Sequence, residues 1–406
     1  MAARQRSRSI KVARVDERLV GAEQMALLQD HLAQLHRGRD HPNRTLHDDT
    51  LLAALLLNFY ESSERSLRQI EDLSCARQAR EFLPGRTPRS TLSDALSSMD
   101  PKRLEPIIKT LLARLPQLRH VDDDLAALCK RLIAADGSLF TVPADVAWAI
   151  AITRSNGKQG RQVRLNLQLD VLHFVPAELD LSGDGDGSES AAFMRKLLKG
   201  VIYLLDRNFV DFVFLHAVLE KESDFVVRLK SDTNFVATQE RPLSRQDRDA
   251  GVIGDRIGHV PGSAGSPGFG QRLLREVIVW DARNKKEVRL LSTLLDVPAR
   301  TIGQLYRQRW MIELFFRWLK CVARFEHLIS HNANGITIQF YVAVIAVLLS
   351  YLRCGQRPGV YEFNCLAWVA RGVMSVANMQ EVLARRQRER DLAKARRAKQ
   401  PATTQA

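Results

Sequence analysis

The chain has 406 residues, of which 45% are hydrophobic and 26% charged, and its 60 Lys and Arg outnumber its 46 Asp and Glu to give a formal charge of +14. A chain of this length is expected to form two or three domains, and its composition is that of a globular protein. A field of this sign attracts polyanions, so nucleic acid or an anionic membrane surface are the partners that the charge favours.

Residues 1–125 are predicted to form a helical N-terminal domain that binds DNA. Apolar residues recur at helical spacing in three segments, 19–35, 50–60 and 104–115. Between the second and third, Pro84-Gly85 and then Thr87-Pro88 indicate a short helix, a turn and a second helix, as in a helix-turn-helix. Arg86 and Arg89 would start the second helix and meet DNA. The alternative is an ordinary helical pair with solvated arginines.

Residues 126–231 predict a mixed α/β sheet with helices on its faces. The expected strands are 132–140, 163–172, 174–183, 201–206 and 224–230, with helices within 188–200 and 210–222. Period-two alternation in the second and third strands indicates antiparallel pairing. The continuous apolar runs of the last two are typical of buried parallel strands. Antiparallel strands followed by parallel crossovers give a mixed sheet.

Residues 232–300 are predicted to be a β-rich insertion. Seven glycines between Gly251 and Gly270 indicate a mobile loop. Two strand-like runs follow at 275–281 and 287–295, and the first of them carries Trp280.

A long helix is predicted to begin near Pro298 and to fill most of residues 301–335. The polar residues Tyr306, Arg309, Glu313 and Lys320 stand at offsets 0, 3, 7 and 14. At about 100° per residue they fall within roughly 60° of one helix face. An apolar stripe occupies the other side: Met311, Ile312, Phe315, Trp318 and Leu319. A carboxylate among cations suits a metal-assisted phosphate site. The alternative is a solvated face with an ion pair between Arg309 and Glu313.

The C-terminal region, 336–406, is predicted to be helical and to end in a basic tail. Its segment 340–352 is apolar but shorter than the roughly 20 residues that a bilayer span needs. We therefore expect a buried core helix and no membrane association. Residues 385–399 hold eight Lys or Arg and no apolar face, which indicates a solvated tail.

The five cysteines are widely spaced and contain no CxxC. This spacing argues against a disulfide framework and a zinc site and fits a reducing cytoplasm. The basic N-terminus has no apolar core followed by a small-residue cleavage site, so we do not expect a secretory signal. A cytoplasmic protein is the expectation.

Two carboxylates stand at the ends of predicted strands. Asp136 ends the first strand and Asp206 the first parallel one. If these strands are neighbours, the two side chains lie together where open α/β sheets bind ligands. Adjacent carboxylates repel unless they are protonated or bridged by a divalent cation, and Mg²⁺ prefers such oxygen ligands. Glu313 could complete a second metal site, which suits in-line phosphoryl displacement.

The spacing Tyr-x2-Arg-x3-Glu-x6-Lys resembles the YREK signature of a large group of bacterial insertion-sequence DDE transposases, which share a ribonuclease H-like catalytic fold. The residues from Asp296 to Glu313 and the Asp-Gly-Ser turn at 136–138 also look like that group. The resemblance covers about 130–335, and the N-terminal helices only loosely. One departure is Asn208, since the group usually has Gly or an acidic residue after Asp-Arg.

The resemblance implies a function for each candidate residue. The implied catalytic metal ligands are Asp136, Asp206 and Glu313, holding Mg²⁺, with Mn²⁺ able to substitute. The implied phosphate contacts are Tyr306, Arg309 and Lys320. Trp280 and Trp310 are candidates to stack a displaced base, with ordinary packing as the alternative.

The activity implied is DNA transposition and recombination, in which element ends are cleaved by hydrolysis and the 3′-OH ends are joined to target DNA. The partners would be double-stranded DNA, as inverted-repeat ends and as target within the nucleoid, and a second copy of the chain. Two ends require two active sites, so a homodimer on DNA is expected, with its contact in residues 340–382. A structure-specific nuclease and a catalytically lapsed DNA-binding remnant are the alternatives.

Overall fold

The computed structural model describes residues 28–36, 46–61, 66–83, 85–115, 128, 130–153, 157–261, 268–321, 328–354, 365, 368 and 374–399. The chain divides into two compact units, Met1–Ala95 with Pro358–Ala406, and Leu96–Arg357. The first unit contains α2 (Gln29–His36), α3 (Asp48–Glu61), α4 (Leu67–Cys75), η1 (Arg77–Glu81) and α15 (Val376–Lys399), and α5 (Arg89–Ser98) crosses the boundary.

The helices predicted before residue 115 are present wherever the structure describes the chain. Residues 19–27 lie outside the described part. The helix-turn-helix segment folds as α4, η1 and α5. Thr87, expected to cap the second helix, instead donates its backbone N–H to the buried hydroxyl of Ser74 at 2.8 Å, and α5 begins two residues later. This bond ties the start of the second helix to the end of the first.

The basic C-terminal segment, predicted as a solvated tail, forms part of the helix α15. Its composition explains this, because Ala, Arg, Lys, Glu and Gln are all strong helix formers. Met379 and Leu383 are buried on α15 and lie one turn apart, while the basic residues after them are mostly exposed.

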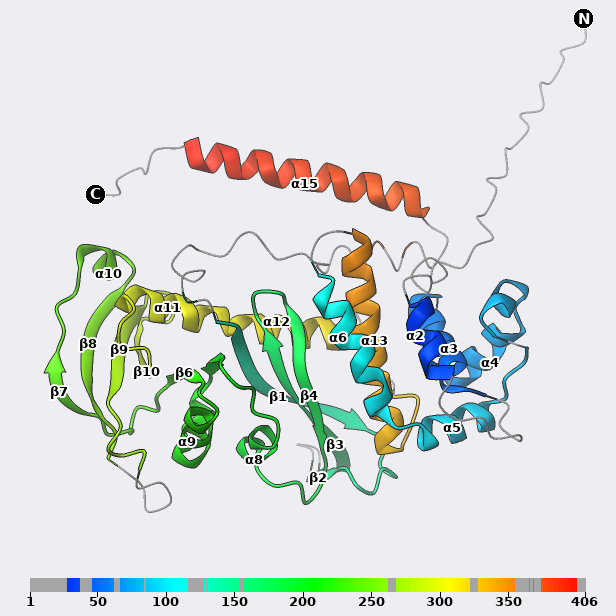
Figure 1. Cartoon of the computed structure of the whole chain (residues 1–406), viewed down its shortest axis with the longest axis horizontal. Coiled ribbons are helices and arrows are strands. Elements are labelled where there is room, and N and C mark those ends of the chain that lie inside the picture. The colour runs from blue at the N-terminus through cyan, green and yellow to red at the C-terminus, as the bar shows by residue number, and fades with distance from the viewer. Residues whose placement is uncertain are drawn as a thin grey trace, which may run out of the picture. The chain divides into compact units, whose positions relative to one another are not determined.

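The second unit is built on one ten-stranded sheet (Figure 1). Its strands are β1 (Leu132–Val142), β2 (Ile150–Thr153), β3 (Gln159–Asp170), β4 (Val175–Ser182), β5 (Ile202–Leu205), β6 (Asp224–Arg228), β7 (Val236–Glu240), β8 (Val252–His259), β9 (Leu274–Asp281) and β10 (Lys286–Ser292). Its helical elements are η2 (Pro101–Leu104), α6 (Glu105–Ala113), α8 (Glu189–Met194), η3 (Arg207–Phe209), α9 (Phe212–Glu220), α10 (Arg245–Asp249), α11 (Ala299–Gln308), α12 (Trp310–Cys321) and α13 (Ala333–Cys354).

The predicted mixed sheet is confirmed. The strand order is β2-β3-β1-β5-β6-β10-β9-β8-β7, with β4 also paired to β3. β3 is antiparallel to both β1 and β4, whereas β1, β5 and β6 are parallel. The short strand β2 was not predicted, and it pairs with the N-terminal end of β3.

The insertion is part of the same sheet. β10 pairs antiparallel with β6, and β9, β8 and β7 follow outward (Figure 1). The prediction of a loop in the glycine-rich segment is partly wrong, since residues 252–259 form β8. Gly258 is needed there because a Cβ would lie 2.1 Å from the backbone oxygen of Val236 on β7. Residues 262–267 of the predicted loop lie outside the described part.

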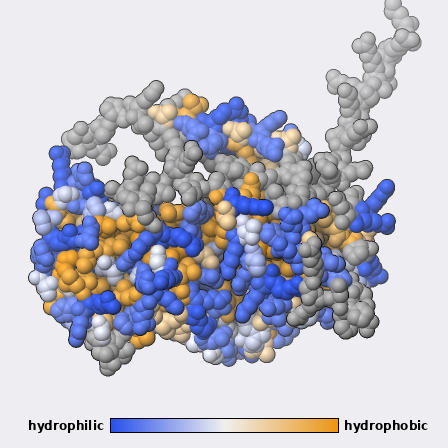
Figure 2. All heavy atoms as spheres, in the orientation of Figure 1, coloured by the Kyte–Doolittle hydropathy of each residue, from blue (hydrophilic) through white to orange (hydrophobic). Residues whose placement is uncertain are grey.

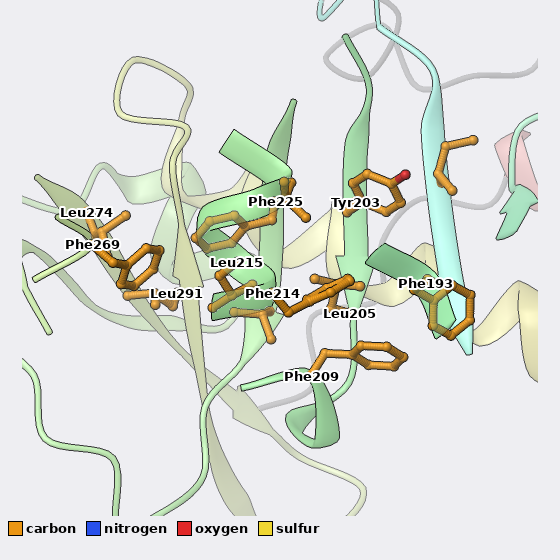
Figure 3. Packing of buried hydrophobic residues seen from close by; sticks show 14 of the residues in the cluster. Phe193, Tyr203, Leu205, Phe209, Phe214, Leu215, Phe225, Phe269, Leu274 and Leu291 are labelled. Carbon is orange, nitrogen blue, oxygen red and sulfur yellow. The ribbon is translucent and has the colours of Figure 1, made fainter. Parts of the chain in front are cut away.

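A hydrophobic cluster joins α8 and α9 to one face of the sheet (Figure 3). β5 contributes Tyr203 and Leu205, and the helices contribute Phe193 and Phe214. In a strand, alternate side chains face opposite sides. The residues between these in β5 therefore face the side on which α11 packs.

The apolar segment 340–352 is the middle of α13, and its prediction as a buried helix is confirmed. Its described apolar side chains between Phe340 and Leu349 are at most 6% exposed, and α13 packs on α6 and β4. None of the helices in the described ranges is long and apolar enough to cross a membrane. The dimer contact predicted in 340–382 stays a prediction: its described side chains from Phe340 to Leu349 are already buried within one chain, and most of 355–373 lies outside the described residues.

Candidate active site

Asp136 and Asp206 stand at equivalent positions on neighbouring parallel strands. The register of β1 and β5 pairs Ala134 with Leu204, and two further residues along each strand lead to Asp136 and Asp206. β5 ends at Leu205, so Asp206 lies at the carboxyl end of its strand. The predicted neighbourhood of the two strands is confirmed. The prediction that Asp136 ends its strand is wrong, because β1 continues through the expected turn to Val142 and stays paired with β3. Asp206 then accepts a bond from the Arg207 amide at 2.6 Å, which starts the turn η3.

Glu313 reaches the same end of the sheet from α12. The guanidinium of Arg309 joins it to Asp136: Nη2 lies 2.5 Å from Glu313 Oε1, and Nη1 lies 3.8 Å from Asp136 Oδ2. The Arg309 side chain is only 12% exposed. The ion pair that the sequence offered as the alternative is thus present, and it lies inside a cluster of carboxylates and not on a solvated face.

The predicted single helix is interrupted at Arg309, where α11 ends and α12 begins (Figure 1). The Arg309 amide bonds to the Tyr306 carbonyl at 3.1 Å, and the Ile312 amide bonds to the Arg309 carbonyl at 3.1 Å. Both are i to i−3 bonds, which tighten the helix locally. The apolar stripe is confirmed for Ile312, Phe315 and Leu319, which are at most 1% exposed.

The pKa of the Asp136 carboxyl is strongly raised in the folded protein. Burial is the largest cause that raises its pKa to about 7, and the charges of Glu189 and Asp206 add to the shift. Arg309 and the Gly137 amide oppose it, the latter by donating to Asp136 Oδ1 at 2.9 Å. Burial together with the neighbouring carboxylates therefore disfavours the charged form of Asp136 more than Arg309 and the Gly137 amide favour it.

The other residues of the predicted polar face have different surroundings. Burial raises the pKa of the Tyr306 hydroxyl, and its ring lies 5.9 Å from the Arg309 guanidinium. The Lys320 ammonium lies 5.0 Å from the centre of the Phe140 ring. Trp310 is 49% exposed, so its indole is available to a ligand.

The family model described as Transposase DDE domain matches residues 127–349. This range contains all of the side chains described above in this site. The chain belongs to this family.

Two relatives are each similar to about half of the chain. "Putative transposase y4zB" of Sinorhizobium fredii is 24% identical over 196 residues, which make up 48% of this chain and 54% of that protein. "Probable transposase for insertion sequence element IS5377" of Geobacillus stearothermophilus is 27% identical over 195 residues, 47% of this chain and 49% of that protein. The chain thus spans about half the length of these curated relatives.

A solved structure was also found, the cryo-EM structure of the piggyBac transposase synaptic complex with hairpin DNA. It is 12% identical, covers 90% of this chain and 80% of its own, and has a TM-score of 0.41. At this identity and TM-score, the similarity supports no inference about this chain.

The donor set of the DDE domain fits a hard divalent cation. Carboxylate oxygens are the ligands that Mg²⁺ prefers, and the pKa of Asp136 is raised by burial and then by the charges of Glu189 and Asp206, a combination that a bound cation would offset. Among the described residues, no three Asp, Glu, His or Cys side chains are arranged to hold a metal ion. Arg309 instead lies between Asp136 and Glu313.

One acidic residue at this site was missed by the sequence reasoning. Glu189 begins α8, and its charge is among the causes of the raised pKa of Asp136. The only sequence signal was an acidic residue after Ser188 at a helix start, which is a common capping pattern and does not indicate an active site.

The remaining predicted DNA contacts are on other elements. Trp280 is 44% exposed on β9. Figure 2 shows apolar surface over β8 and β9. In the N-terminal unit, Arg86 and Arg89 both pair with Glu71, at 2.8 and 3.5 Å. The side chains of both arginines stay more than half exposed. These observations leave the stacking and DNA-binding assignments as predictions.

Proposed function

We propose that this protein is the DNA transposase of an insertion element, which cleaves the element ends by hydrolysis and joins the freed 3′-OH ends to target DNA. The observation that carries the proposal is the convergence of Asp136, Asp206 and Glu313 at one end of the mixed sheet, inside the residues that match the DDE family. A mixed α/β sheet with these carboxylates is consistent with a ribonuclease H-like core.

Asp136, Asp206 and Glu313 would hold the divalent cation, Mg²⁺ or Mn²⁺. Bound there, the cation would supply Lewis-acid activation of water and of the scissile phosphate. The sheet fixes the two aspartates, because Asp136 lies within β1, paired with Leu167 of β3, and Asp206 directly follows β5. α12 fixes Glu313, because its opposite side is anchored by buried Ile312 and Phe315.

Arg309 holds Glu313 close to Asp136, and Tyr306 packs beside it. These contacts favour a second role for Arg309, in addition to the predicted phosphate contact, as the residue that orients two carboxylates. Lys320 and the exposed Trp310 lie on the same helix and would meet DNA near the cut.

Cleavage of both ends of an element implies two active sites, and hence two copies of the chain on DNA. With α13 buried, the described part of the chain offers no support for the predicted contact in 340–352. The dimer therefore stays a prediction that rests on the reaction alone.

The proposal is tested with labelled DNA that carries the inverted repeats flanking the coding region, together with unlabelled target DNA and Mg²⁺. A transposase is expected to give cut ends and joined product. Cutting without joining would favour the structure-specific nuclease, and a mobility shift without cutting would favour the catalytically lapsed remnant. The absence of both binding and cutting would contradict the proposal.

A further inference from the structure

The second half of α15 carries a large share of the positive charge of the protein. Residues 385–399 hold eight Lys or Arg against two acidic residues, Glu389 and Asp391, so this short stretch contributes six of the fourteen excess positive charges. All of it belongs to one helix. At about 1.5 Å per residue, the charges are therefore held along roughly 22 Å of helix.

This half of α15 has no apolar face to pack on a protein core. Met379 and Leu383, in the first half, are 2% and 7% exposed, and none of the described side chains after Leu383 is buried. Apart from alanines, Leu392 is the one apolar residue of the segment 385–399, and it is 60% exposed. Its surface is therefore made mainly of charged and small side chains.

The acidic residues of the segment offset little of its positive charge. Arg385 lies 3.9 Å from Glu389, and with the two side chains 64% and 66% exposed this is a weak surface pair. Asp391 instead accepts a bond from the side-chain amide of Gln387 at 3.1 Å. Arg388 is also exposed and stands one turn after Arg385, a spacing at which like charges destabilise a helix. A polyanion bound along the segment would remove this repulsion.

We propose that residues 385–399 of α15 bind the phosphate backbone of duplex DNA, as a contact separate from the DDE carboxylates. Duplex DNA carries one negative charge per about 1.7 Å of its axis, so about 13 phosphates accompany a helix of this length. The major groove is wide enough to admit an α-helix. An anionic membrane fits less well, because a helix that lies on a bilayer needs an apolar face.

The inference rests on the proposed function in one respect, namely that DNA is the partner. It requires no metal and no cleavage, and phosphate contacts do not depend on base sequence. The test therefore measures binding of the full-length protein to a fluorescent duplex of arbitrary sequence, without Mg²⁺, by anisotropy at several salt concentrations.

The variant that carries Arg385→Gln and Arg388→Gln removes two exposed charges and keeps residues that favour a helix. Its salt slope should be smaller by about two ions, and its affinity near 0.15 M salt should be about 10- to 30-fold weaker. The matched control carries Lys199→Gln and Lys221→Gln, which remove two exposed charges just before β5 and β6. It should bind within about twofold of the wild type. Equal losses in the two variants would mean that only net charge matters, and would overturn the inference.

Cleavage of element ends separates the failure of this inference from the failure of the proposed function. If the arginine variant binds the duplex as the wild type does, the role of α15 is overturned, and the proposed transposase stands as long as ends are still cut and joined. If the arginine variant alone loses affinity but the wild type never cuts DNA, the proposed function fails and the inference stands. A wild type that binds no duplex at all contradicts both.

Amide hydrogen exchange gives a readout within the segment itself, and circular dichroism checks that the variants keep their helices. Exchange at residues 385–399 should slow when duplex is added to the wild type, and should slow less in the arginine variant. Vesicles of phosphatidylserine and phosphatidylcholine are the second probe. Slowing by vesicles and not by duplex would make an anionic membrane the partner, and no slowing by either would leave a solvated helix; both results would overturn the inference.

Discussion

Two groups of buried carboxylates in the same sheet have opposite surroundings. In the insertion, Arg275 pairs with Asp255 through two bonds of 2.8 Å, and Glu276 receives both Arg256 and Arg289. On β1, Asp136 has no such pairing: burial, and then the charges of Glu189 and Asp206, raise its pKa, and Arg309 opposes the shift. The carboxylates of the insertion are paired with arginines within the chain, whereas Asp136 is held in surroundings that disfavour its charged form.

The largest effect is expected at the three proposed metal ligands. Asp136→Ala, Asp206→Ala or Glu313→Ala should each abolish DNA cleavage, while folding and binding to end DNA persist, because phosphate contacts come mainly from cations. Cleavage of labelled end DNA in Mg²⁺ measures this, with circular dichroism as the check of folding. Near-wild-type cleavage by any one of the three would remove that residue from the proposed site.

The paired carboxylates should behave in the opposite way. Asp255→Ala leaves Arg275, whose side chain is 1% exposed, without its charge partner and should lower the free energy of unfolding by about 3–5 kcal/mol. Urea unfolding measures the change. The matched control is Asp249→Ala in the same insertion, where the side chain is 71% exposed and its pair with Arg245 is loose at 3.9 Å; it should change stability by less than about 0.5 kcal/mol. Similar losses in both would show that burial does not decide the effect.

The pH dependence of stability should show directly that the folded protein disfavours the charged form of Asp136. Asp136 has an ordinary pKa of 3.8 and a folded-state pKa of about 7. Between these values the unfolded chain has lost a proton that the folded chain still binds, so the Asp136 contribution to stability falls as pH rises through this window. In EDTA, Asp136→Asn should therefore gain stability over the wild type by about 1–4 kcal/mol at pH 8, and by less at pH 5. If the difference in stability between Asp136→Asn and the wild type does not vary with pH, the pKa of Asp136 is not raised in the folded protein.

The smallest effect is expected for a single cation beside the site. Lys320→Ala should reduce the salt slope of affinity for end DNA by about one ion. The control is Lys199→Ala, whose ammonium is paired with Glu222 at 2.9 Å. Binding isotherms at several salt concentrations measure both slopes. Equal slopes for wild type and Lys320→Ala would leave Lys320 as a packing residue against Phe140.

The sheet was predictable from the sequence because its signals are local. Period-two alternation and apolar runs identify strands, and the end of β5 located Asp206, whereas Asp136 lies inside β1, which is longer than expected. The insertion was harder, since Gly254 and Gly258 suggested a loop, whereas close strand packing requires Gly258. Glu189 was not predictable, because its proximity to Asp136 depends on how α8 packs and on a space left by a residue 52 positions earlier in the chain.

The antiparallel pair of β6 and β10 has a consequence for how the molecule would respond to its ligand. Hydrogen bonds run without interruption from β9, which carries Trp280, through β10 and β6 to β5, which ends before Asp206. The insertion and the strands that carry Asp136 and Asp206 are therefore one continuous hydrogen-bonded sheet, and a ligand that altered the twist of β9 would act on the same sheet that positions the aspartates.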